Sequence, residues 1–289
     1  MSSLTYVSVW CKMNRLADIH TDINDWTEVM RRLAVIMPFL ALLAGAAGFY
    51  LRLTELWNVF DIRTGLPEPG AAITISLVAL TIGFLLVCAV FAIRAGTKYT
   101  SQKGFDNAFG TESLAYPFVF TLFGVVWLGA TVKYFIETNA GDALTASALY
   151  FVILSGLAAL SALLFAIEIY QDPKRKMALA LSVVPILFMC YWLILLYKQN
   201  ASNPILLSYC YYCLAIIAST LSFYYTAGYA FKKPSPGKAA AAYLASIFFC
   251  FVTLADDHPV SAKLILAAIA AMNVVYSSML IKNLQKKGT

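Results

Sequence analysis

Long apolar runs alternate with short polar stretches along most of this chain. Each run is bounded by charged residues or by proline, glycine or asparagine, and nearly all approach the ~20 residues that a helix needs to cross a bilayer core. Backbone groups in lipid must be satisfied within the segment, which favours helices over open sheets. The pattern predicts eight membrane-spanning helices: Leu33–Leu53, Ala71–Ile93, Leu114–Ile136, Leu144–Ile169, Met177–Tyr197, Ile205–Phe231, Ala239–Ala255 and Ser261–Ile281.

Composition agrees with a membrane protein. Hydrophobic residues make up 61% of the 289 residues and charged residues only 12%, whereas soluble domains are roughly 45–50% apolar and about 25% charged. The runs also lack the alternation of apolar and polar residues that is typical of β-barrel strands. We therefore predict an all-α integral membrane protein, a polytopic bundle of eight transmembrane helices.

A shorter amphipathic segment precedes the first span. Ile23, Trp26 and Leu33 recur at helical spacing in Thr21–Leu33, which favours a helix lying in the membrane interface. This helix is either a lead-in anchored by Trp26 or a docking element for a partner. The predicted organisation is a cytoplasmic N-terminal segment with the interfacial helix (1–32), an eight-helix transmembrane domain (33–282) and a short basic cytoplasmic tail (283–289).

Positive charge is distributed unevenly between the two sides of the predicted bundle. With the N-terminus placed in the cytoplasm, 16 of the 21 Lys and Arg residues fall on the inner side. This bias predicts a multi-pass protein of the plasma (inner) membrane with both termini cytoplasmic. The basic inner face suits anionic lipid headgroups and is no argument for nucleic-acid binding. The five basic residues left outside are Arg52, Arg63, Lys133, Lys198 and Lys263.

The central turns of the predicted spans contain polar residues but no charged ones, with Arg52 assigned to the end of its span. Buried charge in a bilayer usually marks function, so ion-coupled transport loses its best support. Asn273 lies halfway along the eighth span and should face another helix. Two interpretations are open for the polar set, helix packing or a path for a polar solute, and its main members are Ser219, Thr220, Asn273 and Ser277.

The stretch "SYCYYC" brings two of the six cysteines to one helix face. Cys210 and Cys213, together with Cys190 and Cys250, are expected at similar depths, roughly 8–12 Å below the outer boundary at ~1.5 Å per residue. A layer of four thiols could form a disulfide or hold a soft metal. Alternatively, each cysteine is a small apolar packing residue.

The turn "DDHP" places Asp256, Asp257 and His258 together at the outer surface. These residue types can ligate a divalent cation, but the same turn is also explained as a solvated stop to the short seventh span. No nucleotide-binding loop, GxSxG elbow or HExxH pair occurs, so no cofactor is evident.

Three functional hypotheses follow from these observations. The first is a non-enzymatic membrane subunit, scaffold or sensor that acts with a protein partner or as a homo-oligomer. The second is a permease for a neutral or amphiphilic solute. The third is a thiol-redox or metal-binding membrane protein that uses the outer cysteine layer.

Overall fold

Eight helices of the computed structural model are long and apolar enough to cross a membrane. The structure describes residues 32–61, 68, 70–100, 108–111, 113–140, 145–171, 181–203 and 205–286. The helices are the first span (Arg32–Asn58), α2 (Ala72–Lys98), α4 (Ala115–Ala140), α5 (Ala146–Gln171), α7 (Val183–Asn200), α8 (Leu206–Ala230), α9 (Pro236–Thr253) and α10 (Val260–Lys282).

This arrangement confirms the predicted all-α polytopic bundle, and each helix overlaps its predicted span. The seventh helix, α9, is short as expected, because it ends just before the turn that contains Asp256. Pro185 lies in the first turn of α7, where its missing N–H is tolerated. Almost all of the predicted interfacial helix, Thr21–Leu33, lies outside the described residues.

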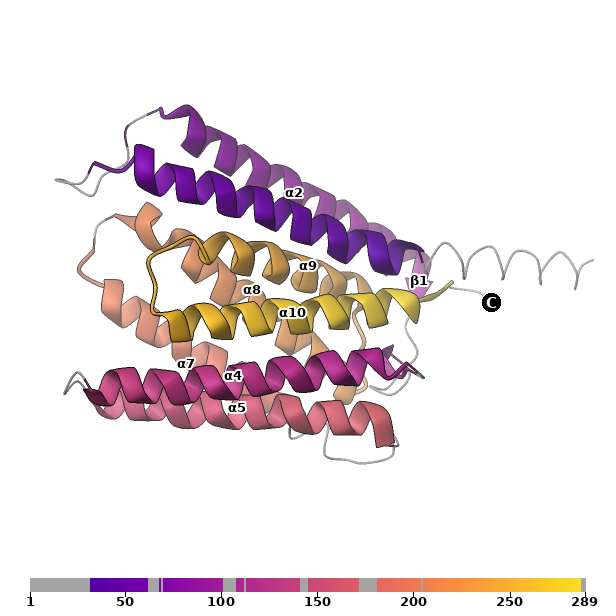
Figure 1. The fold of residues 1–289 in the computed structure, drawn as a ribbon. Helices are drawn as coiled ribbons and strands as arrows, with labels where there is room; N and C mark the ends of the chain where they lie inside the picture. The colour runs from indigo at the N-terminus through magenta and orange to yellow at the C-terminus, as the bar shows by residue number, and fades with distance from the viewer. Residues whose placement is uncertain are drawn as a thin grey trace, which may run out of the picture.

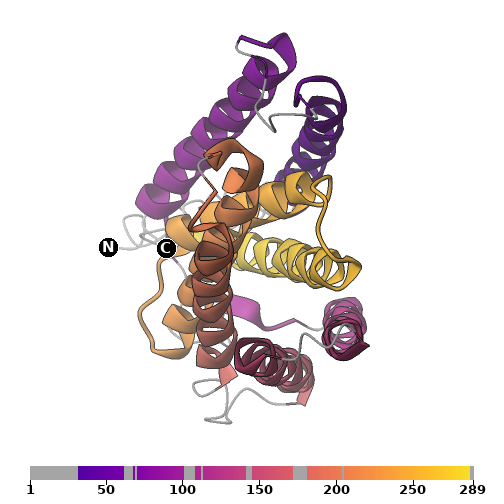
Figure 2. The ribbon, with the colours of Figure 1, turned by 90° about the vertical axis from the view of Figure 1, so that its left-hand side faces the viewer.

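Six of the helices form a ring. Around it, α4 packs on α5, α5 on α7, α7 on α8, α8 on α9 and α9 on α10, and α10 returns to α4. Figure 1 shows these helices running roughly parallel or antiparallel along one axis. Figure 2 looks along that axis and shows the first span and α2 side by side at one edge of the bundle. The first hairpin is therefore an addition to the ring.

Burial differs sharply between the helices. In both α9 and α10, 72% of the most apolar stretch is buried inside the protein, against 22% in α2. The exposed residues of α2 are mostly large and apolar, including Ile82, Leu86 and Val90, as expected for a helix that faces lipid. The two C-terminal helices thus form the centre of the molecule.

Aromatic side chains fill the inside of the ring. Trp127 of α4 is fully buried and lies 5.7 Å from the Phe188 ring of α7 and 6.3 Å from the Phe223 ring of α8. Further along the axis, the Tyr276 ring of α10 lies 4.7 Å from Phe120 and 5.6 Å from Tyr243. Rings at these separations attract one another beyond the area that they bury. The centre of the ring is consequently packed.

Glycine contacts bring the first hairpin close to α9. A Cβ atom added at Gly48 of the first span would lie 2.6 Å from Val252 of α9. One added at Gly237, in the first turn of α9, would overlap the carbonyl oxygen of Ala92 in α2. Small residues allow such close helix approach in membranes. The two ends of α9 therefore contact the two different helices of the hairpin.

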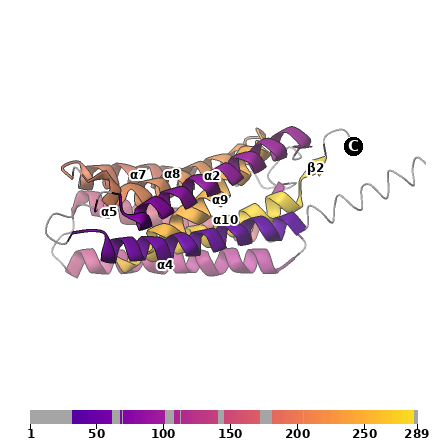
Figure 3. The same ribbon diagram turned by 90° about the horizontal axis from the view of Figure 1, so that it is seen from above.

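A short strand pair closes the end of the bundle opposite Arg52. Strand β1 (Tyr99–Thr100) follows α2 directly and pairs antiparallel with β2 (Gln285–Lys286). Figure 3 shows β2 continuing from α10 beside the end of α2. The start of the predicted tail is thus held against the first hairpin.

Candidate functional site

A buried arginine is the most unusual residue of the bundle. Arg52 lies six residues before the end of the first span, and its exposed fraction is 0%. Its Nε donates to Asp256 Oδ1 at 2.7 Å, and its Nη1 donates to Glu55 Oε2 at 2.8 Å. Asp256 lies in the α9–α10 turn, so this pair joins the first span to the opposite end of the sequence. We call Arg52, Glu55 and Asp256 the Arg52 cluster.

Two further elements, α8 and α2, contact the guanidinium or its carboxylate partners. Arg52 Nη2 donates to the carbonyl oxygens of Leu207 and Ser208 in the first turn of α8, each at 3.2 Å. The Tyr211 ring of α8 lies 5.3 Å from the guanidinium carbon, within the range of a cation–π contact. Thr74 of α2 donates to Glu55 Oε1 at 2.7 Å. The cluster therefore joins the first span, α2, α8 and the α9–α10 turn.

The charges of the Arg52 cluster do not cancel. It contains one cation and two carboxylates, and Glu55 and Asp256 are only 1% and 3% exposed. Buried charges need both a counter-charge and hydrogen bonds to offset the loss of hydration. Lys263 of α10 also attracts Asp256, but its side chain is partly exposed. The cluster thus carries an excess of one negative charge.

These contacts correct two interpretations of the sequence. The turn that contains Asp256, Asp257 and His258 is not a uniformly solvated surface cluster, because Asp256 is buried, His258 is half-buried and only Asp257 is exposed. Arg52 is not a terminal residue, since the first span continues past it to Asn58. In the sequence, the i, i+3 spacing of Arg52 and Glu55 indicates an ion pair. Asp256, the second partner of Arg52, lies 204 positions away, and no local spacing indicates that pair.

His258 lies beside the cluster in a fixed orientation. Its imidazole lies 4.0 Å from the Tyr212 ring, and the Tyr212 hydroxyl accepts a hydrogen bond from Trp192 of α7 at 2.9 Å. Burial, followed by repulsion from Lys263, lowers the pKa of His258 to about 4. Burial also raises the pKa of the Asp256 carboxyl, an effect that the neighbouring Arg52 partly offsets. The imidazole is therefore neutral at neutral pH.

Two polar atoms of this turn face each other without a hydrogen bond. Asp256 Oδ2 and His258 Nε2 are 3.8 Å apart. Neither atom has a hydrogen-bond partner among the described residues, and both are buried. Unsatisfied buried groups are uncommon in native proteins and call for an explanation.

The second buried polar group lies in the middle of the bundle. Asn273 of α10 donates through Nδ2 to Ser246 of α9 at 2.9 Å, and Ser246 shares a 2.8 Å hydrogen bond with Ser219 of α8. Cys250 lies 3.5 Å from the Ser219 hydroxyl. Of the predicted polar set, the structure thus brings Asn273 and Ser219 into one network. Thr220 and Ser277 instead donate to carbonyl oxygens of their own helices.

The four outer cysteines do not gather into one cluster. Cys250 is buried inside the bundle, Cys190 is exposed, and Cys210 and Cys213 are half-buried on one face of α8. Across the described residues, no group of three or more His, Cys, Asp or Glu side chains is placed to hold a metal ion. The described residues therefore give no support to the four-thiol interpretation, because Cys190 faces outward and Cys250 lies inside the bundle.

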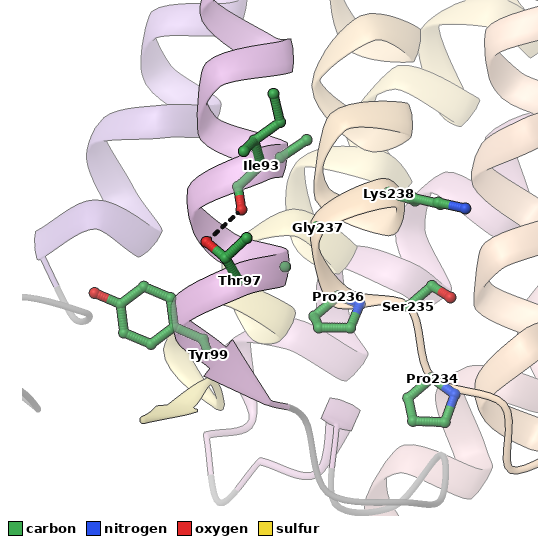
Figure 4. Close-up of a pocket in the computed structure, with 10 residues that line it drawn as sticks. Ile93, Thr97, Tyr99, Pro234, Ser235, Pro236, Gly237 and Lys238 are labelled. Carbon is green, nitrogen blue, oxygen red and sulfur yellow. Dashed lines mark hydrogen bonds between the residues drawn. The ribbon is translucent and has the colours of Figure 1, made fainter. Parts of the chain in front are cut away.

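A groove lies at the other end of the bundle, where α2 crosses α9. Its volume is about 520 Å³. Figure 4 shows the Thr97 hydroxyl bonded to the Ile93 carbonyl oxygen and the Lys238 side chain directed away from α2. Of the polar groups of the groove, Thr97 is thus used locally and Lys238 is turned outward. Its lining consists of Ala92, Ile93, Gly96, Thr97, Tyr99 and Pro234 to Lys238.

Comparisons with known proteins add no functional assignment to this geometry. Neither a family model, nor a curated protein, nor a solved structure matches the chain.

Proposed function

We propose that this multi-pass protein is a non-enzymatic membrane subunit or scaffold that acts through a partner protein or a second copy of itself. The observation that carries this proposal is the filled ring, in which Trp127, Phe188 and Phe223 meet across the interior. Large, fully buried aromatic side chains favour a rigid structural bundle over a solute path.

The use of the buried polar groups supports the same proposal. In a permease, polar side chains face a cavity that the solute enters. Here Asn273, Ser246 and Ser219 bond to one another between three packed helices, as helix-joining groups do in membranes. Arg52 likewise joins separate segments of the chain. Both networks hold helices together.

The exposed face of α2 is the place to look for the partner. This helix is the least buried of the eight spans, and Gly83 on its exposed side has no atom within 4 Å of an added Cβ. Glycine on a lipid-facing surface lets another helix approach closely.

A photo-cross-linking amino acid at Leu86 of α2, introduced in native membranes, tests the proposal. We expect one discrete adduct with a defined polypeptide, which Gly83→Leu should reduce at least fivefold. The matched control carries the cross-linker at Leu160, an exposed residue of α5, together with Gly83→Leu, and its yield should not change. A purified monomer that transports a neutral solute into liposomes, with transport abolished by Asn273→Leu, would overturn the proposal in favour of a permease.

A further inference from the structure

Two buried atoms of the α9–α10 turn, Asp256 Oδ2 and His258 Nε2, restrict which groups can bond to them. A carboxylate oxygen accepts hydrogen bonds only, and an imidazole nitrogen donates one only when it carries a proton. Asp256 Oδ2 and His258 Nε2 lie 3.8 Å apart and buried. A hydrogen bond between these two atoms therefore requires a proton on one of them.

The net charge of the Arg52 cluster favours one added positive charge, while burial and repulsion from Lys263 and Arg52 confine proton uptake on His258 to acidic pH. The first span contributes Arg52 and Glu55, and Asp256 brings the cluster to one negative charge in excess. Tyr211 and Tyr212 face the site from α8 as neutral side chains. Lys263 of α10 and the exposed Asp257 also act on His258, with opposite signs. One added positive charge makes the cluster neutral, whereas a divalent cation would give it a net positive charge beside Arg52.

We propose that Asp256 and His258 form a proton-binding site, in which one proton joins the Asp256 carboxylate to the imidazole. Protonated imidazole is a donor at both nitrogens. The 3.8 Å separation needs to shorten by about 1 Å to reach an ordinary charge-assisted hydrogen bond. The half-buried position of His258 gives the proton access from the solvent side.

The proton-binding site is connected to the rest of the molecule through its two partners. Asp256 Oδ1 remains bonded to Arg52 of the first span, so proton uptake on Oδ2 changes the charge that Arg52 faces. His258 packs against the Tyr212 ring, and the Tyr212 hydroxyl accepts a hydrogen bond from Trp192 of α7. A proton taken up in this turn therefore acts on both the first hairpin and the ring. This inference does not depend on the proposed partner.

Nitrogen-15 NMR of labelled histidine tests the site, because His20 is the only other histidine of the sequence. In full-length His20→Gln protein in detergent, the His258 Nε2 resonance is followed from pH 8 to pH 2. We expect Asp256→Asn to lower the proton affinity of His258 at least tenfold. Glu137→Gln, which removes an exposed carboxylate from α4, should change it less than twofold.

A second variant keeps the test decisive if Asp256→Asn does not fold. Glu55→Gln removes the excess negative charge and leaves the Arg52–Asp256 contact in place, so it should also lower the proton affinity of His258, by at least threefold. An affinity unchanged in Glu55→Gln or in folded Asp256→Asn would overturn the proposal. A shift of the His258 resonance by equimolar Zn²⁺ at pH 7.5 would replace it with a metal site.

Discussion

At the scale of single residues, Arg52 differs from the exposed charges of the described residues because each of its three guanidinium nitrogens donates to a protein oxygen in place of water. Its guanidinium donates to two carboxylates and two carbonyl oxygens. Bonds of this kind fix position more than they add stability, since desolvation offsets much of the attraction. Losing one partner is nevertheless costly, because the others stay buried and unpaired.

Arg52→Met should therefore destabilise the protein strongly. It leaves Glu55 and Asp256 buried as two unpaired carboxylates, which we expect to lower the free energy of unfolding by about 3–5 kcal/mol. Thermal or denaturant unfolding in a mild detergent measures the effect. Lys133→Met is the matched control, since it breaks a pair of exposed side chains (45% and 40%), for which at most about 1 kcal/mol is expected.

A charge-balanced variant separates the loss of charge pairing from the loss of packing. Adding Glu55→Gln and Asp256→Asn to Arg52→Met removes all three charges, and at least half of the lost stability should return. If the triple variant is as unstable as Arg52→Met alone, the arginine stabilises the bundle through its packing and not through its charge.

His258 should make stability depend on pH. Its pKa is about 4 in the folded protein, below the ordinary value of 6.5, so between these values the unfolded chain binds the proton and the folded chain does not. Stability from this group is complete above pH 6.5 and is lost as the pH falls toward 4, by roughly 3 kcal/mol. The raised pKa of Asp256 acts in the opposite direction.

Comparison with His258→Gln gives the contribution of the histidine together with its coupling to Asp256. The unfolding free energy of the wild type minus that of His258→Gln should fall as the pH falls from 6.5 to 4. A constant difference across that range would show that the imidazole is as accessible to protons in the folded protein as in the unfolded one.

At the scale of elements, α9 organises the fold, because it contacts α8 and α10 of the ring and both helices of the first hairpin. Its small residues explain how a helix of 18 residues can have so many neighbours. Phe84 of α2 stacks on Phe248 of α9 at 4.8 Å between the glycine contacts. The first hairpin is thus attached to α9 by close backbone approach and by one aromatic pair.

Gly237→Ala should disturb the crossing of α2 and α9. The added methyl group would overlap the Ala92 carbonyl oxygen and lie 2.9 Å from the Gly96 nitrogen, so the backbones must separate. We expect a loss of about 1–3 kcal/mol in the free energy of unfolding. Gly83→Ala is the control, because no atom lies within 4 Å of its added Cβ, and it should change stability by less than about 0.5 kcal/mol. Equal effects of the two substitutions would contradict the crossing geometry.

The spans were predictable from the sequence, whereas the main site was predicted only in part. Hydrophobic length and bounding charges depend on local composition, so every span was located. The Arg52–Asp256 pair depends on which helices become neighbours in three dimensions, and an apolar pattern does not contain that information. Asn273 was found because an amide in the middle of a span needs a partner wherever the helix packs. The four cysteines form no metal-binding group among the described residues, because depth along a helix does not fix the direction of a side chain.

At the scale of the whole molecule, the bundle has two chemically different ends. One end carries the Arg52 cluster and the α9–α10 turn, and the other carries the β1–β2 pair and the start of α9. The predicted orientation places the Arg52 cluster outside and the lysine-rich end in the cytoplasm, since 16 of the 21 basic residues belong to that side.

Labelling of single cysteines in intact cells tests this orientation. In a background whose six native cysteines are replaced by alanine, Asp257→Cys and Lys238→Cys each place one thiol at an exposed position, just after the end of α9 and in its first turn, respectively. A membrane-impermeant maleimide should label Asp257→Cys in intact cells and Lys238→Cys only after permeabilisation, by at least a tenfold difference. The reverse pattern would place the proton-binding turn in the cytoplasm. It would then respond to the cytoplasmic pH and not to that of the exterior, and the basic end would not face the anionic inner leaflet.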